Sequence, residues 1–430
     1  MEGSATTRRN RRLRAVGRHL AAAPDSRPLL FVGSFTDVFG GRGDGISSFR
    51  LEPSDGALEP TAPPLDVGYD PSNLALHPQK RILYYGCEGN DYDHPYDAEH
   101  DDRSAVGCCA IKPDGALTPL NRISYPGSPA QVQVDRSGRW LLAANYLGGT
   151  VTVFSLESDG TLGSLHQTIV HADPSAVDET RQLSAHCHMI TLDATNRFCL
   201  VADLGTDACH TYRFDETSGE LQPLARVALP PGSGPRHMCF HPSQRWIFVL
   251  HELSAMLSVH AFDAETGELG SPAAPPLLQL CSEAPCCASG PALHIRDCLP
   301  ADFTGGRSGA DLHVHPNGRW VYSSNRGHDT IVRFEFDAAT ATLSPAREWS
   351  AGGGAGPRNF CILPGGRVML VANSSGQPVE FGEPQVGGNV TAFHIGADGG
   401  LEPTGAVRQV GTPVWLMFVQ DGWWFRHGFQ

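Results

Sequence analysis

One short sequence pattern occurs six times along this chain of 430 residues. In one copy, residues 234–237 lead into an apolar run, a turn at residues 241–245, a second apolar run and a polar end at His251 and Glu252. With His241 taken as position zero, the equivalent residues are His77, Asp135, Asp193, His315 and Leu363, and an arginine follows each of the six by four positions. Successive copies lie 48 to 74 residues apart, a period near that of β-propeller blades and longer than helical repeats usually show.

Each copy predicts four short strands. The apolar runs at residues 238–240 and 246–250 flank a turn and predict a hairpin buried on both faces. A third run, such as residues 150–156, alternates apolar and polar side chains and ends at an acidic turn, after which we expect an outer strand. Four antiparallel strands per blade are typical of a propeller, so the predicted fold class is all-β.

The two ends of the chain predict how the ring closes. The six copies give blades at about residues 71–127, 128–183, 184–233, 234–308, 309–355 and 356–410. Residues 414–418 resemble a first strand, and residues 30–33, 45–51 and 55–58 resemble the other three. We therefore expect a seven-bladed β-propeller over residues 29–418, closed by pairing of the N- and C-terminal strands. An insertion at about residues 271–308 is read as a surface loop, and residues 1–28 and 419–430 fall outside the pattern.

The net charge and the hydropathy of the chain restrict the classes of partner that we expect it to bind. The formal net charge is −14, whereas duplex binding draws much of its affinity from basic patches, so we expect no nucleic acid partner. No apolar stretch reaches the eighteen or more residues of a membrane helix, so we expect no membrane association. We also predict no obligate protein partner. An anionic ligand would need a local cluster of arginines.

The cysteines and the N-terminal residues indicate in which cellular compartment the protein is expected. The twelve cysteines are scattered, which favours reduced thiols in the cytoplasm. The group Cys281, Cys286, Cys287 and Cys298 lacks the paired spacing of structural zinc sites, so we interpret it as a cluster of unpaired thiols in a loop and predict no metal there. The arginine-rich residues 1–28 are compatible with an organelle transit peptide and equally with a disordered basic tail.

Two repeat positions gather ionisable residues. Positions −5 and +11 lie opposite each other at the far end of the two inner strands of a blade, so we expect them at one mouth of the central channel. In different blades, position −5 is occupied by Ala130, His188, Arg236, Ala310 and Arg358. Position +11 is occupied by Glu88, Tyr146, Glu252, Arg326 and Ser374. Folding alone does not require such groups at a channel rim.

The chemistry of these residues suggests a site for an anion. Arg236, Arg326 and Arg358 match the geometry of carboxylate and phosphate groups, and Glu252 and His188 are the candidate acid and base. The alternative interpretation is that these groups form salt bridges that stiffen the channel. Their convergence on one rim favours function, and we also expect substrate contacts from Glu88, Tyr146, His186 and His237.

Several blocks of sequence carry a family resemblance. Residues 143–149 (AANYLGG), 234–237 (GPRH), 251–253 (HEL) and 324–329 (SNRGHD) resemble signature blocks of the seven-bladed propeller lactonase family. That family includes bacterial-type 6-phosphogluconolactonases and fungal carboxy-cis,cis-muconate cyclases. The resemblance covers about residues 29–418 and implies a sugar lactone hydrolase without a metal or organic cofactor. It implies a catalytic set of His188, Arg236, Glu252 and Arg326.

Three functions are compatible with these observations. The first is hydrolysis of 6-phosphoglucono-1,5-lactone to 6-phosphogluconate in the oxidative pentose phosphate route, with a small anionic lactone as substrate and with either Glu252 or His188 activating water. The second keeps the site but catalyses cycloisomerisation of a carboxymuconate. The third is a propeller without catalytic activity that binds a partner protein on its faces.

Overall fold

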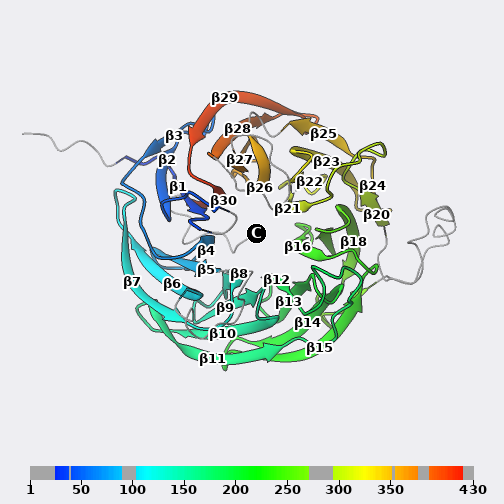
Figure 1. Ribbon diagram of the computed structural model, residues 1–430, viewed down its shortest axis with the longest axis horizontal. Helices are drawn as coiled ribbons and strands as arrows, with labels where there is room; N and C mark the ends of the chain where they lie inside the picture. Colours follow the sequence, from blue (N-terminus) through cyan, green and yellow to red (C-terminus); the bar gives the residue numbers. More distant parts are fainter. Residues whose placement is uncertain are drawn as a thin grey trace, which may run out of the picture.

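Seven four-stranded blades surround a common axis in the computed structural model (Figure 1). The structure describes residues 25–37, 40–89, 103–270, 294–350, 354–375 and 387–419. All regular elements within these ranges are strands, which confirms the predicted all-β class. No helix in this part of the chain has the length and apolar character needed to cross a membrane.

The innermost strand of each blade faces the axis, and neighbouring innermost strands contact each other around the ring. These strands are β4 (Pro71–Leu76), β8 (Pro129–Val134), β12 (Cys187–Leu192), β16 (Pro235–Phe240), β21 (Gly309–Val314), β26 (Ala355–Ile362) and β30 (Pro413–Val419). The second strands are β5 (Ile82–Cys87), β9 (Trp140–Asn145), β13 (Phe198–Asp203), β17 (Trp246–His251), β22 (Trp320–Asn325), β27 (Val368–Ser375) and β1 (Leu29–Ser34). Because both faces of these second strands pack against neighbouring blades, they are buried almost throughout.

The fourth strands are more exposed and alternate in burial, whereas the third strands are largely buried. The third strands are β6 (Ala105–Ile111), β10 (Thr150–Leu156), β14 (Ala208–Asp215), β18 (Met256–Phe262), β23 (Thr330–Asp337), β28 (Asn389–Ile395) and β2 (Ser47–Leu51). The fourth strands are β7 (Leu117–Ser124), β11 (Leu162–Val170), β15 (Glu220–Ala228), β19 (Leu269–Gly270) with β20 (His294–Asp297), β24 (Thr342–Leu343) with β25 (Arg347–Ser350), β29 (Leu401–Gln409) and β3 (Leu58–Pro60).

The ring closes as the sequence predicts. Strand β30 from the C-terminal end pairs antiparallel with β1 from the N-terminal end, with Leu30 opposite Phe418. The seventh sheet has the order β3-β2-β1-β30. Val419 still belongs to β30, one residue beyond the predicted boundary of the C-terminal tail.

The fourth blade corrects the predicted insertion. Residues 294–297, which the sequence analysis assigned to a surface loop, form β20 and pair with the same third strand, β18, as β19 does. Residues 271–293, including Cys281, Cys286 and Cys287, lie outside the described residues, whereas Cys298 is buried in the core of the blade. The outer strand of the fourth blade therefore consists of two pieces, β19 and β20, which are separated in sequence but pair with the same third strand.

The residue at repeat position zero explains why the pattern recurs. The carboxylate of Asp135 accepts hydrogen bonds from the backbone N–H groups of Ser137 and Arg139, at 2.8 Å each, and so caps the hairpin turn. The same residue joins neighbouring blades, because Asn196 of the third blade donates to Asp135 of the second at 3.0 Å. His241 Nε2 likewise bonds the carbonyl of Gly318 in the following blade at 2.9 Å. Position zero thus caps one turn and contacts the next blade.

The arginines four positions later lie at these same turns, away from the ionisable cluster. Arg197 donates to the carbonyl of Ala264 in the next blade at 2.6 Å, and Arg81 donates to the carbonyl of Ile111 in its own blade at 3.2 Å. Their contacts are those of turn and packing residues.

Two buried histidines make stability depend on pH. His251 and His260 bond the hydroxyl of Ser258 at 2.9 and 2.8 Å, and burial lowers the pKa of His251 to about 3 and that of His260 to about 4. Since the unfolded chain binds these protons at about pH 6.5, stability is complete above that pH and is lost as pH falls toward the folded values. We expect the free energy of unfolding to drop by roughly 1.4 kcal/mol per pH unit for each histidine between pH 6 and pH 4.5. Urea unfolding at several pH values measures this drop. If the free energy of unfolding of His251→Gln fell with pH as steeply as that of the wild type, the role assigned to His251 would be contradicted.

Candidate active site

The ionisable residues at repeat positions −5 and +11 meet at one end of the inner strands. Each described −5 residue of blades one to six lies where the register between the two inner strands shifts, as at Arg236 between Pro235 and His237. A β-bulge turns a side chain away from the regular alternation and is common beside functional sites. The repeat therefore places the same local distortion in successive blades.

Glu252 lies at the centre of a cluster of arginines. Its Oε2 accepts from Arg236 Nε at 2.8 Å and lies 3.0 Å from Arg326 Nη2. Its Oε1 accepts from Arg181 Nη2 at 2.7 Å. Burial by itself would raise the pKa of Glu252, but Arg326, Arg181 and Arg236 outweigh it and hold that pKa well below its usual range. Glu252 is consequently an ionised carboxylate with both oxygens occupied.

Arg181 was not predicted from the sequence. It lies on the segment between β11 and β12, outside every repeat position, and also donates to the hydroxyl of Tyr146 at 2.8 Å. No motif or spacing marks it in the sequence, since its place depends on how the segment folds back over the third blade.

His188 is a buried, neutral imidazole beside this cluster. Burial and the nearby Arg236 and His237 hold its pKa well below the ordinary value. Its Nε2 lies 3.9 Å from Glu252 Oε2, and its Nδ1 has no hydrogen-bond partner among the described residues. The Nε of Arg326 is likewise buried without a partner in this part of the chain. Buried polar atoms are rarely left unpaired, so a base and a donor without partners in one cluster indicate the place of a bound water or ligand.

The two arginines of this inner cluster remain cationic. Burial lowers the pKa of Arg236 to about 10 and that of Arg326 to about 9, which leaves both protonated at neutral pH. Arg236 also donates to the carbonyl of Ala310 in the next blade, and Arg326 to the carbonyl of Gly309 at 3.2 Å. These contacts fix both guanidinium groups in place.

Two other predicted residues, His237 and His186, contact Arg236 and Tyr146 respectively. His237 has both ring nitrogens engaged, Nδ1 with Asp311 at 2.7 Å and Nε2 with Arg236 at 3.0 Å. His186 has Nδ1 on the carbonyl of Tyr146 at 2.8 Å and stacks on the tyrosine ring at 4.4 Å. His237 thus orients Arg236, and His186 orients Tyr146. His186 Nε2 lies 3.2 Å from the hydroxyl of Ser184, so neither imidazole has a ring nitrogen left over for substrate.

Glu88 and Arg358 are the remaining carboxylate and guanidinium of the predicted set. Burial raises the pKa of Glu88, and the nearby Arg358 only partly opposes this. Arg358 is half-buried, with its guanidinium 4.6 Å from the centre of the Phe35 ring. The two carboxyl groups near the axis thus differ: Glu252 is held ionised and Glu88 is pushed toward its neutral form.

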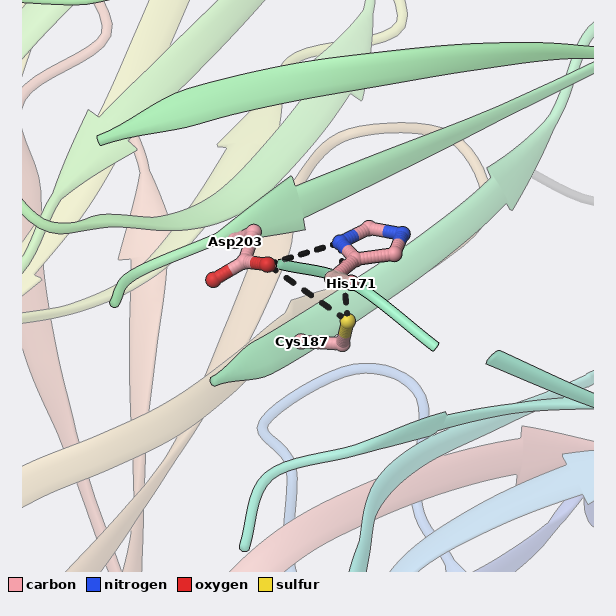
Figure 2. A group of neighbouring side chains, drawn as sticks. All are labelled: His171, Cys187 and Asp203. Atoms are coloured by element: carbon pink, nitrogen blue, oxygen red, sulfur yellow. Dashed lines mark hydrogen bonds and ion pairs between the residues drawn. The ribbon is translucent and has the colours of Figure 1, made fainter. Parts of the chain in front are cut away.

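One group of possible metal ligands occurs among the described residues. His171, Cys187 and Asp203 bring a nitrogen, a sulfur and an oxygen within 4.8 Å of one another (Figure 2). His171 Nδ1 lies only 2.7 Å from Asp203 Oδ2, however, and its Nε2 bonds Tyr212 at 2.6 Å. Two ligands of one tetrahedral zinc ion, each at about 2.1 Å, would lie about 3.4 Å apart. These distances are those of a hydrogen-bonded network between buried side chains, and they do not fit the ligand separation of a tetrahedral zinc ion.

Comparisons with known proteins agree with this architecture. The family model described as "Lactonase, 7-bladed beta-propeller" matches residues 29–279 and 291–418. The 6-phosphogluconolactonase of Bacillus subtilis (strain 168) is 29% identical over 364 residues, covering 84% of this chain and 93% of that relative. The 6-phosphogluconolactonase of Serratia proteamaculans (strain 568) is 29% identical over 353 residues, covering 80% and 86%. The solved periplasmic gluconolactonase of Pseudomonas aeruginosa is 27% identical with a TM-score of 0.75, covering 91% of this chain and 99% of that one.

Proposed function

Because the chain belongs to the seven-bladed β-propeller lactonase family, we propose that it hydrolyses 6-phosphoglucono-1,5-lactone to 6-phosphogluconate. Relatives named for this reaction align over most of the chain, and the described cluster supplies groups for each step. The observation that carries the proposal is the buried, neutral His188 with an unpartnered Nδ1 next to cationic Arg236 and Arg326.

His188 is the general base of this proposal. Glu252 Oε2 lies on the Nε2 side of the imidazole at 3.9 Å, which favours a proton on Nε2 and leaves Nδ1 as the acceptor. Nδ1 takes a proton from water as its oxygen attacks the lactone carbonyl. The imidazolium then returns the proton to the ring oxygen as the C–O bond breaks, so that ring opening yields the acid without a cofactor.

The arginines stabilise the charge that develops on the carbonyl oxygen. Arg236 and Arg326 are held rigidly before substrate binds, by Glu252 and by backbone carbonyls. A positive field fixed in advance stabilises a tetrahedral oxyanion without reorganisation during the reaction. Glu252 has both oxygens engaged by guanidinium groups, so we assign it to orienting them and leave proton transfer to His188.

The direct test is an assay of the purified chain on two substrates. We expect catalysed proton release, followed in a pH-stat above the spontaneous rate, from 6-phosphoglucono-1,5-lactone, and no absorbance change with carboxy-cis,cis-muconate. Conversion of the muconate alone would favour the cycloisomerase, since the same arginines can hold carboxylates. Turnover of neither substrate would favour a binding propeller.

Compartment and partners remain proposals. Nine described cysteines are unpaired thiols, as expected in a reducing compartment, and on this basis we propose the cytoplasm. A small anionic lactone is the proposed partner, with no nucleic acid, membrane or obligate protein partner. The transit-peptide alternative for residues 1–28 concerns a segment of which the structure describes only residues 25–28.

A further inference from the structure

A belt of polar contacts joins the inner strands at the residue four positions before position zero. In six blades this residue is Asn73, Gln131, Met189, His237, Asp311 and Asn359. In five of them its side chain bonds the backbone of the next inner strand. Gln131, for example, accepts from the N–H of Ile190 at 2.9 Å. The common task of this position is therefore to join neighbouring blades.

Blade four departs from this pattern at His237. The N–H of Leu312, which is the equivalent donor in the next inner strand, is taken by the carboxylate of Asp311 at 2.8 Å. The imidazole of His237 bonds side chains instead. Its Nδ1 lies 2.7 Å from Asp311 Oδ1, and its Nε2 lies 3.0 Å from Arg236 Nη1. His237 therefore connects the belt to a guanidinium of the candidate active site.

These contacts determine which nitrogen of His237 carries the proton. A guanidinium has only N–H donors, so Nε2 must accept from Arg236, and the proton lies on Nδ1 and is donated to Asp311. Burial and Arg236 lower the pKa of His237 to about 4, so the ring is neutral. Burial alone would raise the pKa of Asp311, but His313 and the hydrogen bond from His237 hold that pKa well below its usual range. Asp311 is thus an ionised acceptor for the Nδ1 proton.

The two oxygens of Asp311 have different tasks. Oδ2 accepts from the N–H of Phe360 at 3.0 Å and from the amide of Asn359 at 2.7 Å, both in the following blade. Oδ1 accepts from His237. The belt itself requires only one oxygen, since the amide oxygen of Asn359 makes the equivalent contact with the N–H of Leu416 at 2.8 Å. The second oxygen of the carboxylate serves the imidazole.

The orientation of Arg236 depends on this arrangement. Its Nε donates to Glu252 at 2.8 Å, and its Nη1 donates to the carbonyl of Ala310 and to His237 Nε2. If His237 carried its proton on Nε2, two N–H donors would face each other and the guanidinium would turn away. A donor that is fixed before the reaction stabilises a developing oxyanion better than one that must reorganise.

We propose that Asp311 is a positioning residue for lactone hydrolysis: it holds the proton of His237 on Nδ1, which makes Nε2 an acceptor that fixes Arg236 for stabilisation of the oxyanion. The inference rests on the proposed lactonase activity and extends its supporting residues from blade four into blade five. A buried aspartate also controls the tautomer of a histidine in serine hydrolase triads, but here the histidine orients a cation and transfers no proton.

The substitution Asp311→Asn tests this role. The amide oxygen can keep the contacts with Phe360 and Asn359, while the NH2 group faces His237 Nδ1 and favours a proton on Nε2. We expect kcat for 6-phosphoglucono-1,5-lactone to fall about 10- to 100-fold, with KM within about threefold of the wild type, because the lost interaction acts in the transition state. A wild-type kcat in this variant would overturn the inference.

Asp193→Asn is the matched control. It makes the same change in a buried carboxylate that accepts from the N–H groups of Arg197 and Phe198, at 2.8 Å each, at the other end of the inner strands. We expect it to lower the melting temperature without lowering kcat. An equal loss of kcat in Asp193→Asn would assign the effect of Asp311→Asn to general instability and overturn the positioning role.

Two substitutions at His237 make the test independent of the stability of Asp311→Asn. Glutamine brings an amide oxygen near the former Nε2, where it accepts from Arg236 whatever the state of Asp311, whereas asparagine ends near the former Nδ1. We expect kcat of His237→Gln to exceed that of His237→Asn by about tenfold, and Asp311→Asn to cause no further loss in the His237→Gln background. Equal kcat values for the two variants, or losses that multiply in the double variant, would contradict the proposal.

The tautomer can be observed without catalysis. Long-range proton–nitrogen correlation spectra of the full chain with isotope-labelled histidine should show the His237 proton on Nδ1, and on Nε2 in Asp311→Asn, with His237→Gln identifying the signal. A proton on Nε2 in a wild type that hydrolyses the lactone would refute this inference alone. If the wild type has the Nδ1 tautomer but hydrolyses no lactone, the proposed function is refuted, and the role of Asp311 in that reaction falls with it.

Discussion

Replacing His188 by glutamine is expected to lower kcat for lactone hydrolysis by about 100- to 10,000-fold, the usual contribution of a positioned general base. Glutamine is polar and similar in size but cannot take up a proton at neutral pH. Initial rates above the spontaneous hydrolysis of the lactone measure the effect. Since burial and Arg236 lower the pKa of His188, the acidic limb of the wild-type kcat profile should lie below pH 6.5 and be absent in the variant.

The substitution Glu252→Gln is expected to affect stability, unlike His188→Gln. The change leaves three cationic side chains around a neutral amide, and removing one partner of a buried ion pair costs about 3–5 kcal/mol. We therefore expect this variant to lose stability together with activity, whereas His188→Gln unfolds within a few degrees of the wild type. A His188→Gln enzyme with wild-type kcat would remove this residue from the mechanism and return the role of base to a carboxylate.

Ending the chain at Thr412, before β30, is expected to abolish folding. The strand buries Val414, Leu416 and Val419, and each such side chain contributes about 1.5–3 kcal/mol. The sum, about 5–9 kcal/mol, is comparable with the total stability of a typical domain. Its loss also uncovers the edge of β1, which becomes free to pair with other chains.

A chain ending at Val419 is the matched control, because it retains the whole of β30. We expect it to show the thermal unfolding and β-sheet circular dichroism of the full chain, while the shorter one is recovered as aggregate. A soluble truncation at Thr412 with an unchanged melting temperature would show that β1 closes the ring without the C-terminal strand.

Much of the fold could be read from the sequence, for reasons visible in the structure. Where position zero is an aspartate or a histidine, its side chain caps the hairpin turn or contacts the next blade. Five of the six copies have one of these residues there, so the repeat becomes detectable. The register of strands that are buried on both faces follows from their apolar runs. In blade four the sequence predicts an outer strand after the acidic turn, where β19 lies, but β20 was missed, because it is short and 23 residues separate it from β19.

The clustering of the candidate site residues was predicted in part. Repeat geometry identified Arg236, Glu252 and Arg326, which the structure joins through one carboxylate. It also placed His188 nearby but left its role and that of Glu252 open. What separates them is the environment of each group, namely three guanidinium partners for Glu252 and an unpartnered nitrogen for His188.

The sequence by itself determined the seven-bladed ring, its closure and the positions from which ionisable side chains face the axis, because these depend on local patterns repeated from blade to blade. Tertiary structure alone decided that Arg181 joins the cluster and that the oxygens of Glu252 are taken by arginines. Those contacts join residues up to 74 positions apart, and no local periodicity encodes which distant side chain reaches a given oxygen.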